Sequence, residues 1–538
     1  MKTHSIHILL LLTLLLTACG PAAERPATFT DTDEVADIYP DYGGVTVPPN
    51  IAPLTFIVRD SLADAFVVEF TAEGNSENCE SSGNFIVAAK SGGLVQPDTA
   101  AWRTLLQANT GKTAEITVYA RSNGQWKRHR PLSFSISDEP IDAYLSYRLI
   151  EPGYELYRQL GIYQRNLTTY EETPIYENNR TFDDDENHCV NCHNYQANDT
   201  RRMLFHVRSN HGGTIIIDNG EISKIGIKHD SILSAGVYPS WHPTLPLVAF
   251  STNLTGQIFH MQHSERIEVL DEASDLLLYD AKENTVSKIF STNKQFETFP
   301  CWAPSGDRLY YVSADVPNLP DTLAPKDRGS WMMEHYSELH YNIWSMPFDT
   351  LTRTFGEPQL EVDCAAEGKS ASVPRISPDG RFLLYTVADY GQFHIWHKSA
   401  DLCIRPTNQS APHTAPEGAS IALPTDSIVP HSGGERGANL NSPEAESFHS
   451  WSSNSRWIAF ASRRDDGNFT RIYISYIDSS GNARKPFLLP QLDPRQNIRL
   501  LKSYNVPELT RNPVQVSTAK IRKAVLEQEQ KVSKFIEK

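Results

Sequence analysis

The stretches Tyr238-Pro-Ser-Trp-His-Pro and Phe299-Pro-Cys-Trp-Ala-Pro decide how this chain is expected to fold. Each combines an aromatic residue, a proline and a tryptophan, and each is followed by a β-forming run such as Leu247-Val-Ala-Phe-Ser. Val373-Pro-Arg-Ile-Ser-Pro-Asp-Gly and Phe448-His-Ser-Trp-Ser-Ser repeat the pattern. Recurrence of this kind is typical of a fold built from similar supersecondary units.

The repeats recur at intervals longer than the roughly 40 to 45 residues of a propeller blade, so each is expected to carry an insertion. We place each motif at a turn, the β-run after it as the innermost strand, and Asp275–Asp280 and Val286–Phe290 as the second and third strands of one blade. The pattern resembles the six-bladed TolB-like, WD-type β-propeller. That resemblance implies a ring over residues 141–508, closed by a strand around Leu501 to Pro507.

Composition agrees with an all-β, folded protein. The 538 residues are 40% hydrophobic and 21% charged, and 34 prolines and 29 glycines stand against 6 methionines. The net charge of −16 speaks against nucleic-acid binding, which needs clustered basic residues. The sequence contains no G-x-S-x-G, phosphate-loop or H-E-x-x-H motif, so peptidase, nucleotide-hydrolysing and zincin chemistry lack support.

The regions that flank the ring have their own patterns. Short β-runs and a hairpin around Asn123-Gly124 predict a β-sandwich over residues 41–140, with a helix at Ala100–Ala108. Residues 509–538 predict a helical tail whose apolar residues dock on the same chain: Ile521, Val525, Val532, Phe535 and Ile536. Arg405–Glu446 is dense in Pro, Ser, Gly and Thr, which predicts a long insertion.

The N-terminus predicts export. Lys2 precedes an apolar run from Ile8 to Leu16, and Leu16-Thr-Ala-Cys19 resembles the lipobox of bacterial lipoproteins. We therefore expect a signal peptide over 1–18, a lipidated Cys19 and a tether over 19–40. The protein would be lipid-anchored in the cell envelope and face the periplasm, and Gly20 favours the outer membrane by resemblance. The alternative is an ordinary secretory signal with an incidental cysteine.

Two of the seven cysteines stand together in Cys189-Val-Asn-Cys192-His193. This is the CxxCH pattern of covalent haem c attachment, in which two thiols add to the haem vinyl groups and the histidine is the proximal iron ligand. A redox CxxC or half of a zinc site is the alternative, although no second CxxC is present. Of the other cysteines, Cys364 and Cys403 are compatible with a disulfide, and Cys301 beside a tryptophan suits a buried thiol.

The alignment of the repeats puts the haem motif on a rim turn of the ring. Met203 and His206 are candidates for the sixth iron ligand, on opposite sides of their strand, and Met203 is preferred. Arg201 and Arg202 would then meet the haem propionates.

The combination resembles a group of Bacteroidetes lipoproteins in which a TolB-like propeller carries a CxxCH turn, often labelled cytochrome c biogenesis proteins. The matching blocks span most of the mature chain: Pro48–Leu54, Ile150–Tyr154, Cys189–His193, Ser447–Trp457 and Ser503–Glu508. These labels imply location more than activity.

Three functions remain open. The favoured one is an electron carrier that serves a periplasmic or membrane redox protein, which the acidic run Asp183–Glu186 would attract if that partner is basic. The second is a haem peroxidase-like enzyme, which needs an open iron position. The third is a protein-interaction scaffold with a structural or sensing haem, because a propeller does not dictate function.

Overall fold

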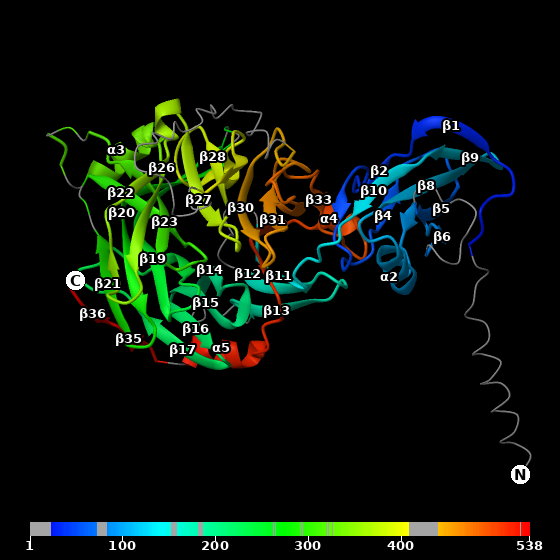
Figure 1. Ribbon diagram of the computed structural model, residues 1–538. Helices are drawn as coiled ribbons and strands as arrows, with labels where there is room; N and C mark the ends of the chain where they lie inside the picture. The colour runs from blue at the N-terminus through cyan, green and yellow to red at the C-terminus, as the bar shows by residue number, and fades with distance from the viewer. Residues whose placement is uncertain are drawn as a thin grey trace, which may run out of the picture. The chain divides into compact units, whose positions relative to one another are not determined.

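The chain divides into two compact units. The computed structural model describes residues 23–72, 83–151, 159–180, 187–261, 263, 265–290, 292, 294–318, 320, 322–324, 327–407, 439–527 and 529–537. Unit 1 comprises Met1–Pro49, Pro53–Asp138 and Pro490–Gln496, and unit 2 comprises Asn50–Ala52, Glu139–Leu489 and Asn497–Lys538. Figure 1 labels most of their elements.

Unit 1 is a β-sandwich with one helix. The larger sheet has the order β1-β9-β8-β10-β3, with β5 paired to β8 and β6 to β5, and the smaller has the order β2-β4-β7. The strands are β1 (Thr30–Val35), β2 (Ile38–Tyr39), β3 (Thr46–Val47), β4 (Phe56–Val58), β5 (Ala65–Ala72), β6 (Phe85–Ala88), β7 (Leu94–Val95), β8 (Thr113–Ser122), β9 (Gln125–Arg130) and β10 (Leu132–Ile136).

The expected helix forms in this unit as α2 (Thr99–Ala108), one residue longer than predicted. The Asp98 carboxylate accepts hydrogen bonds from the backbone N–H groups of Ala100 and Ala101 and so begins the helix. Trp102 is fully buried, and its ring stacks on Phe134 with centroids 5.8 Å apart. The helix therefore packs its apolar face on the larger sheet.

The tether predicted over residues 19–40 is too long. β1 runs parallel to β9, and Lys127 and Arg128 pair with Glu34 and Asp31 at 2.9 and 2.7 Å. Five of the six residues from Thr30 to Val35 are exposed, and all but Val35 are polar. Its strand character comes from pairing with an edge strand, and composition alone does not reveal that.

Unit 2 is a closed ring of six sheets over its described residues. Its strands are β11 (Tyr144–Ile150), β12 (Leu160–Asn166), β13 (Glu172–Glu177), β14 (His188–Gln196), β15 (Asp199–Ser209), β16 (Gly213–Asp218), β17 (Glu221–Gly226), β18 (Val237–Trp241), β19 (Leu247–Phe259), β20 (Ile267–Asp280), β21 (Thr285–Phe290), β22 (Gln295–Trp302), β23 (Arg308–Asp315), β24 (Asn342–Asp349), β25 (Thr354–Phe355), β26 (Gln359–Val362), β27 (Ser370–Ile376), β28 (Phe382–Ala388), β29 (Asp401–Pro406), β30 (Glu446–Trp451), β31 (Trp457–Ser462), β32 (Arg471–Tyr476), β33 (Phe487–Leu488) and β34 (Ser503–Thr510).

The innermost strands touch in a cycle. They follow the order β34, β14, β18, β22, β27 and β30, and β30 contacts β34 again. The sheet of β34 joins the two ends of the ring, because β34 pairs antiparallel with β11. The all-β, propeller-type fold is therefore confirmed, and closure leaves no inner sheet edge exposed.

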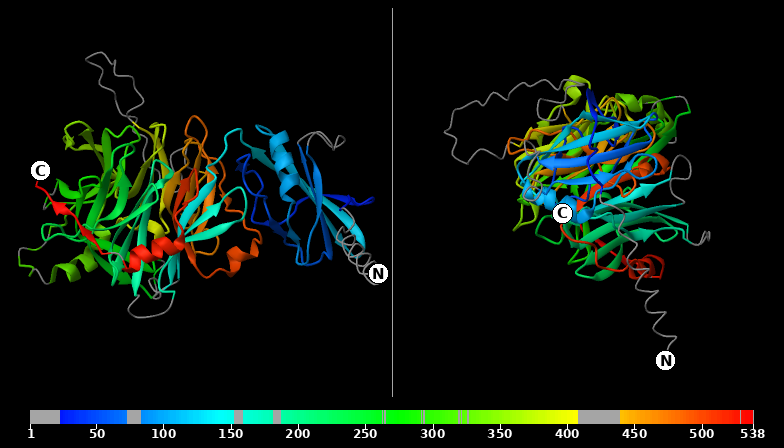
Figure 2. Two further views of the ribbon diagram at one scale, coloured as in Figure 1. Left: turned by 90° about the horizontal axis from the view of Figure 1, so that it is seen from below. Right: turned by 90° about the vertical axis from the view of Figure 1, so that its right-hand side faces the viewer.

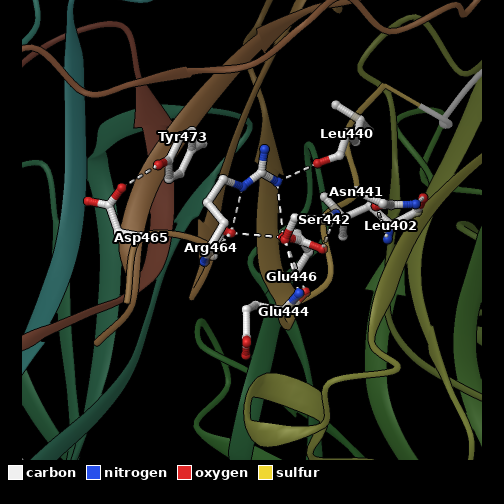
Figure 3. A network of polar contacts seen from close by, with 10 residues as sticks. Leu402, Leu440, Asn441, Ser442, Glu444, Glu446, Arg464, Asp465 and Tyr473 are labelled. Atoms are coloured by element: carbon white, nitrogen blue, oxygen red, sulfur yellow. Dashed lines mark hydrogen bonds and ion pairs between the residues drawn. The ribbon is translucent and has the colours of Figure 1, made fainter. Parts of the chain in front are cut away.

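Short helices fill the connections of unit 2. They are α3 (Arg328–His335), η4 (Tyr336–Glu338), η5 (Ala365–Glu367) and η6 (His394–Trp396), and α4 (Arg495–Arg499) follows β33. The end of the predicted insertion is anchored by a buried carboxylate, Glu446, shown in Figure 3. Ser442 Oγ and Arg464 Nη2 lie 2.6 and 3.0 Å from Glu446 Oε1. Burial raises the pKa of Glu446 to about 7, although Arg464 opposes the shift. Most of the insertion, residues 408–438, lies outside the described part.

The repeat motifs are strands and not turns. The aromatic-Pro-Ser-Trp segments form the innermost strands themselves, and the β-runs after them are the second strands, such as β19 and β23. The runs at Asp275 and Val286 are accordingly the third and fourth strands, β20 and β21. The CxxCH motif therefore lies in the innermost strand β14 and not on a rim turn.

The tail is helical only at its start. α5 (Thr518–Glu527) buries Ile521 and Val525 on unit 2, as predicted. Beyond it, β35 (Lys531–Val532) and β36 (Lys534–Phe535) add parallel strands to β17 and β21. Figure 2 shows the red tail running along the outer edges of the green sheets. The unpaired backbone groups at the outer edges of these sheets therefore favour strand pairing over the helix that the spacing of the apolar residues predicts.

The proposed disulfide is absent, and the buried thiol is confirmed. Cys364 and Cys403 are free and buried, and Cys301 is 6% exposed. Burial raises the pKa of Cys364 and Cys403, the latter to about 12. Both thiols are thus held in the protonated form, which is the unreactive one.

One left-handed residue recurs in each innermost strand. Their φ values run from 46° to 55°, and the pairing register shifts beside each of them. These residues are Cys192, Tyr238, Phe299, Val373, Phe448 and Val506. Each is a β-bulge, which bends the strand and places two consecutive side chains on one side.

The second residue after the bulge links neighbouring sheets. Ser240 Oγ accepts a hydrogen bond from the backbone N–H of Trp302 at 3.0 Å. Asn194 Oδ1 accepts from Trp241 N–H at 3.2 Å, and Ser450 Oγ from Leu509 N–H at 3.2 Å. These bonds join inner strands that share no ladder.

We expect Ser240→Ala to lower the free energy of unfolding by about 1–3 kcal/mol, because the buried N–H of Trp302 loses its acceptor. Urea denaturation followed by tryptophan fluorescence measures the change. Ser231→Ala, at an exposed position, is the control and should stay within about 0.5 kcal/mol of the wild type. Equal stability of the two variants would show that the inter-sheet bond is dispensable.

Candidate functional site

A cavity of about 1610 Å³ lies inside the ring of unit 2. Its wall includes all six bulge residues and parts of the loops that connect the strands. Small-molecule sites usually measure about 300–1,000 Å³, so this cavity can hold a large organic group.

Both thiols of the CxxCH motif line this cavity. Cys189 and Asn191 share a face because side chains alternate along β14, and the bulge turns Cys192 to the same side. Asn191 Nδ2 lies 3.6 Å from Cys189 Sγ. Burial raises the pKa of Cys189, and the nearby charges of Arg148 and Arg208 oppose that shift.

His193 also lines the cavity but is only 2% exposed. Neither of its ring nitrogens has a well-formed hydrogen bond within the described residues. Its pKa is lowered to about 3, mainly by burial and also by the charge of Arg148, while backbone groups of Ser146 and Val506 oppose the shift. The imidazole is therefore neutral near pH 7, the form that binds metals.

His206 comes to the same cavity from the adjacent strand. It lies directly opposite Asn191 in the β14–β15 pair, and it is 4% exposed. Its Nδ1 lies 3.4 Å from Thr214 Oγ1. Its pKa is lowered to about 3, mainly by burial and also by the charge of Arg208. A second neutral imidazole thus faces the space beside the motif.

Met203, Arg201 and Arg202 are not brought to the cavity. Met203 is fully buried in an apolar cluster with Val190 and Phe205, on the other face of β15. Arg201 pairs with Asp199 at 2.6 Å, and Arg202 with Asp218 at 2.9 Å. Strand alternation separates Met203 from His206 as expected, but the face that carries His206 is the one toward the cavity.

The sequence gives no sign of the cationic side chains that line the cavity. Six are present: Arg148, Arg208, Lys228, Arg266, Arg375 and Arg463. Among the described lining residues Glu151 is the one carboxylate, and it pairs with Lys502 at 2.8 Å. The cations come from several sheets far apart in the sequence, so only the ring closure assembles them.

The donor set suits a covalently attached haem. Two free thiols and a neutral imidazole without a well-formed hydrogen bond line one cavity that is large enough for a macrocycle. Within the described residues no group of three or more His, Cys, Asp or Glu side chains is placed to hold a bare metal ion. Cys19 and Asp183–Glu186 lie outside the described part. No described helix is long and apolar enough to cross a membrane.

Comparison with known proteins gives distant matches. No protein-family model matches the chain, and no curated protein does. A prolyl endopeptidase is 9% identical with a TM-score of 0.33, over 64% of this chain and 42% of that one. The tricorn protease is 10% identical with a TM-score of 0.29, over 81% and 43%. A luciferin-regenerating enzyme is 10% identical with a TM-score of 0.31, over 63% and 90%.

The ring is expected to lose stability in acid because it buries neutral histidines. His449 follows the Phe448 bulge, is 2% exposed, and has its pKa lowered to about 3 by burial and by Arg375. An unfolded histidine has a pKa near 6.5, so between about pH 6.5 and pH 3 the unfolded state binds more protons. Stability is complete above this window and falls as the pH falls through it.

We expect His449→Gln to reduce the loss of unfolding free energy between pH 7 and pH 5 by about 2 kcal/mol. Urea denaturation at the two pH values measures this difference. His229→Gln, at an exposed position, is the control and should leave the pH dependence unchanged. A wild-type pH dependence in His449→Gln would mean that this histidine is not buried in its neutral form.

Proposed function

We propose that this chain is a c-type haem protein that carries electrons in the cell envelope. The observation that supports it is the convergence of Cys189, Cys192 and His193 on one large cavity. A bound haem supplies one-electron redox chemistry. The two thiols would add across the haem vinyl groups, and His193 would donate an imidazole nitrogen to iron.

The sixth position is assigned to His206 in this proposal. His206 lines the cavity with the motif, whereas Met203 packs in the core. Its low pKa leaves the ring unprotonated at neutral pH, so no proton has to leave before the nitrogen binds a metal.

A redox partner would meet the chain at the cavity mouth. Leu254, Phe259 and Met261 line the cavity and are 45%, 45% and 83% exposed. Exposed apolar residues next to a pocket are typical of interaction surfaces. The partner is a periplasmic or membrane redox protein in this proposal.

A haem peroxidase-like enzyme is the second candidate. Its support is the size of the cavity, about 1610 Å³, which leaves room for a small substrate beside the cofactor. The occupation of the sixth position separates the two functions, because a side chain there favours electron transfer.

The first test is covalent haem attachment in cells that mature cytochrome c. The wild-type chain should show an α-band and the added mass of haem, and Cys192→Ala should lose full covalent attachment. His193→Ala should keep the thioether bonds but change the spectrum. Cys301→Ala is the matched control, because this thiol is buried in the ring at a position that does not line the cavity.

Absence of haem mass and α-band from the wild-type protein would refute both haem functions. The same spectra test the sixth position: His206→Ala should alter the spectrum, and Met203→Ala should not. An unchanged spectrum in His206→Ala would leave the position open and favour the peroxidase-like function.

The envelope location rests on the lipobox-like segment. We expect Cys19→Ala to move the protein from the membrane fraction to the soluble fraction, because two acyl chains are needed for stable anchoring. Cys301→Ala should remain with the membranes. Quantitative membrane association of Cys19→Ala would contradict a lipid anchor at this residue.

A further inference from the structure

The cavity has the opposite charge to the protein. The chain carries a net charge of −16, yet six cations and one carboxylate line the cavity among the described residues. The carboxylate, Glu151, is already paired with Lys502. Walls of one sign around a recess focus the electrostatic field and concentrate ions of the other sign. The cavity therefore attracts anions.

Arg148 and Arg208 form the core of this positive region. Arg148 Nη1 donates to the backbone oxygen of Val190 at 3.2 Å, but its Nε is buried without a hydrogen-bond partner in the described part. Burial lowers the pKa of Arg148, Cys189 and Cys192 oppose the shift, and the charge of Arg208 adds to it. Two like charges that act on each other beside one recess are costly unless an anion joins them.

The rest of the wall is aromatic. Tyr238, Phe299 and Phe448 line it at their bulges. Arg463 lies 3.2 Å from the ring centre of Trp396, and both residues face the cavity. Aromatic faces bind apolar groups, so the wall suits a ligand with an apolar body as well as a charge.

We propose that this cavity binds an organic anion, a carboxylate or a phosphate ester with an apolar body, whose charged group lies between Arg148 and Arg208. The site is distinct from haem attachment. Arg208 lies directly opposite Cys189 in the β14–β15 pair, and Arg148 donates to the backbone oxygen of Val190, so both arginines lie beside the thiols but would hold the anion without them. Binding of the anion therefore does not require haem attachment.

The test is calorimetric titration of the full chain with phenyl phosphate and with benzoate. Benzyl alcohol, which has the same ring without a charge, is the reference probe. We expect at least one charged probe to bind with a 1:1 stoichiometry and the alcohol to bind at least about tenfold more weakly. Binding of phenyl phosphate alone would identify a phosphate ester as the ligand class, and binding of benzoate alone would identify a carboxylate.

Variants locate the site. Arg148→Gln and Arg208→Gln should each weaken binding at least about tenfold, and Arg148→Lys should restore part of it. Arg208 is exposed, so we expect its substitution to leave folding intact. The Arg208 variant therefore tests the site even if the Arg148 variant is unstable. Arg201→Gln is the matched control, because this arginine lies on the same strand outside the cavity, and its affinity should stay within about twofold of wild type.

The same titration of the Cys189→Ala/Cys192→Ala double variant separates this proposal from the haem proposal. Retained anion binding without haem mass supports the anion site alone. Absence of binding for both charged probes at millimolar concentration, or equal affinity in wild type and Arg208→Gln, overturns the anion site and leaves the haem proposal standing.

Discussion

The larger unit depends on the pairing of β34 with β11, which joins strands from the two ends of the ring. Bringing together residues more than 300 positions apart is entropically costly, so the contact must be strong. Leu145 and Leu509 pair there without exposed surface, and the rings of Tyr147 and Tyr504 meet at 4.9 Å. Asn198 adds a link outside the ladder by donating to the backbone oxygens of Trp451 and Leu509. Without this closure the six sheets would have no common interior.

The bulge residues of the six innermost strands form the wall of the cavity. Left-handed residues other than glycine cost about 1–3 kcal/mol each, yet one stands in every innermost strand. The position two residues farther on is mostly polar and links the strands, and Glu508 there contacts Arg375 at 3.5 Å. Of the residues at this position only Arg375 lines the cavity. The bulge residues therefore form the cavity wall, and the residues two positions after them support it.

The sequence predicts the β-sandwich, the ring and its closing strand, because hydrophobic periodicity and turn residues are local signals. It does not predict which strand of a blade a motif occupies, since a motif and the run after it are equally β-forming. The displacement of CxxCH from turn to inner strand follows from that ambiguity. Which face of β15 meets the cavity, and hence the choice between Met203 and His206, depends on neighbouring sheets. The cationic lining of the cavity cannot be predicted either, because its residues come from several sheets that only the closed ring brings together.

Two of the six sheets depart from the repeat: that of β30, where His449 follows Phe448, and that of β14, which holds the cysteines. Four of the six innermost strands place proline directly after the bulge residue, where its ring fixes the backbone and removes a donor. β14 has Cys192 and His193 at these two positions. Neither residue helps to form the bulge as a proline would, and His193 buries two nitrogens without well-formed hydrogen bonds. Arg148 buries a further Nε that has no hydrogen-bond partner among the described residues. Stability alone would favour an aromatic residue and a proline here, as in the neighbouring strand β18, so these residues point to a function.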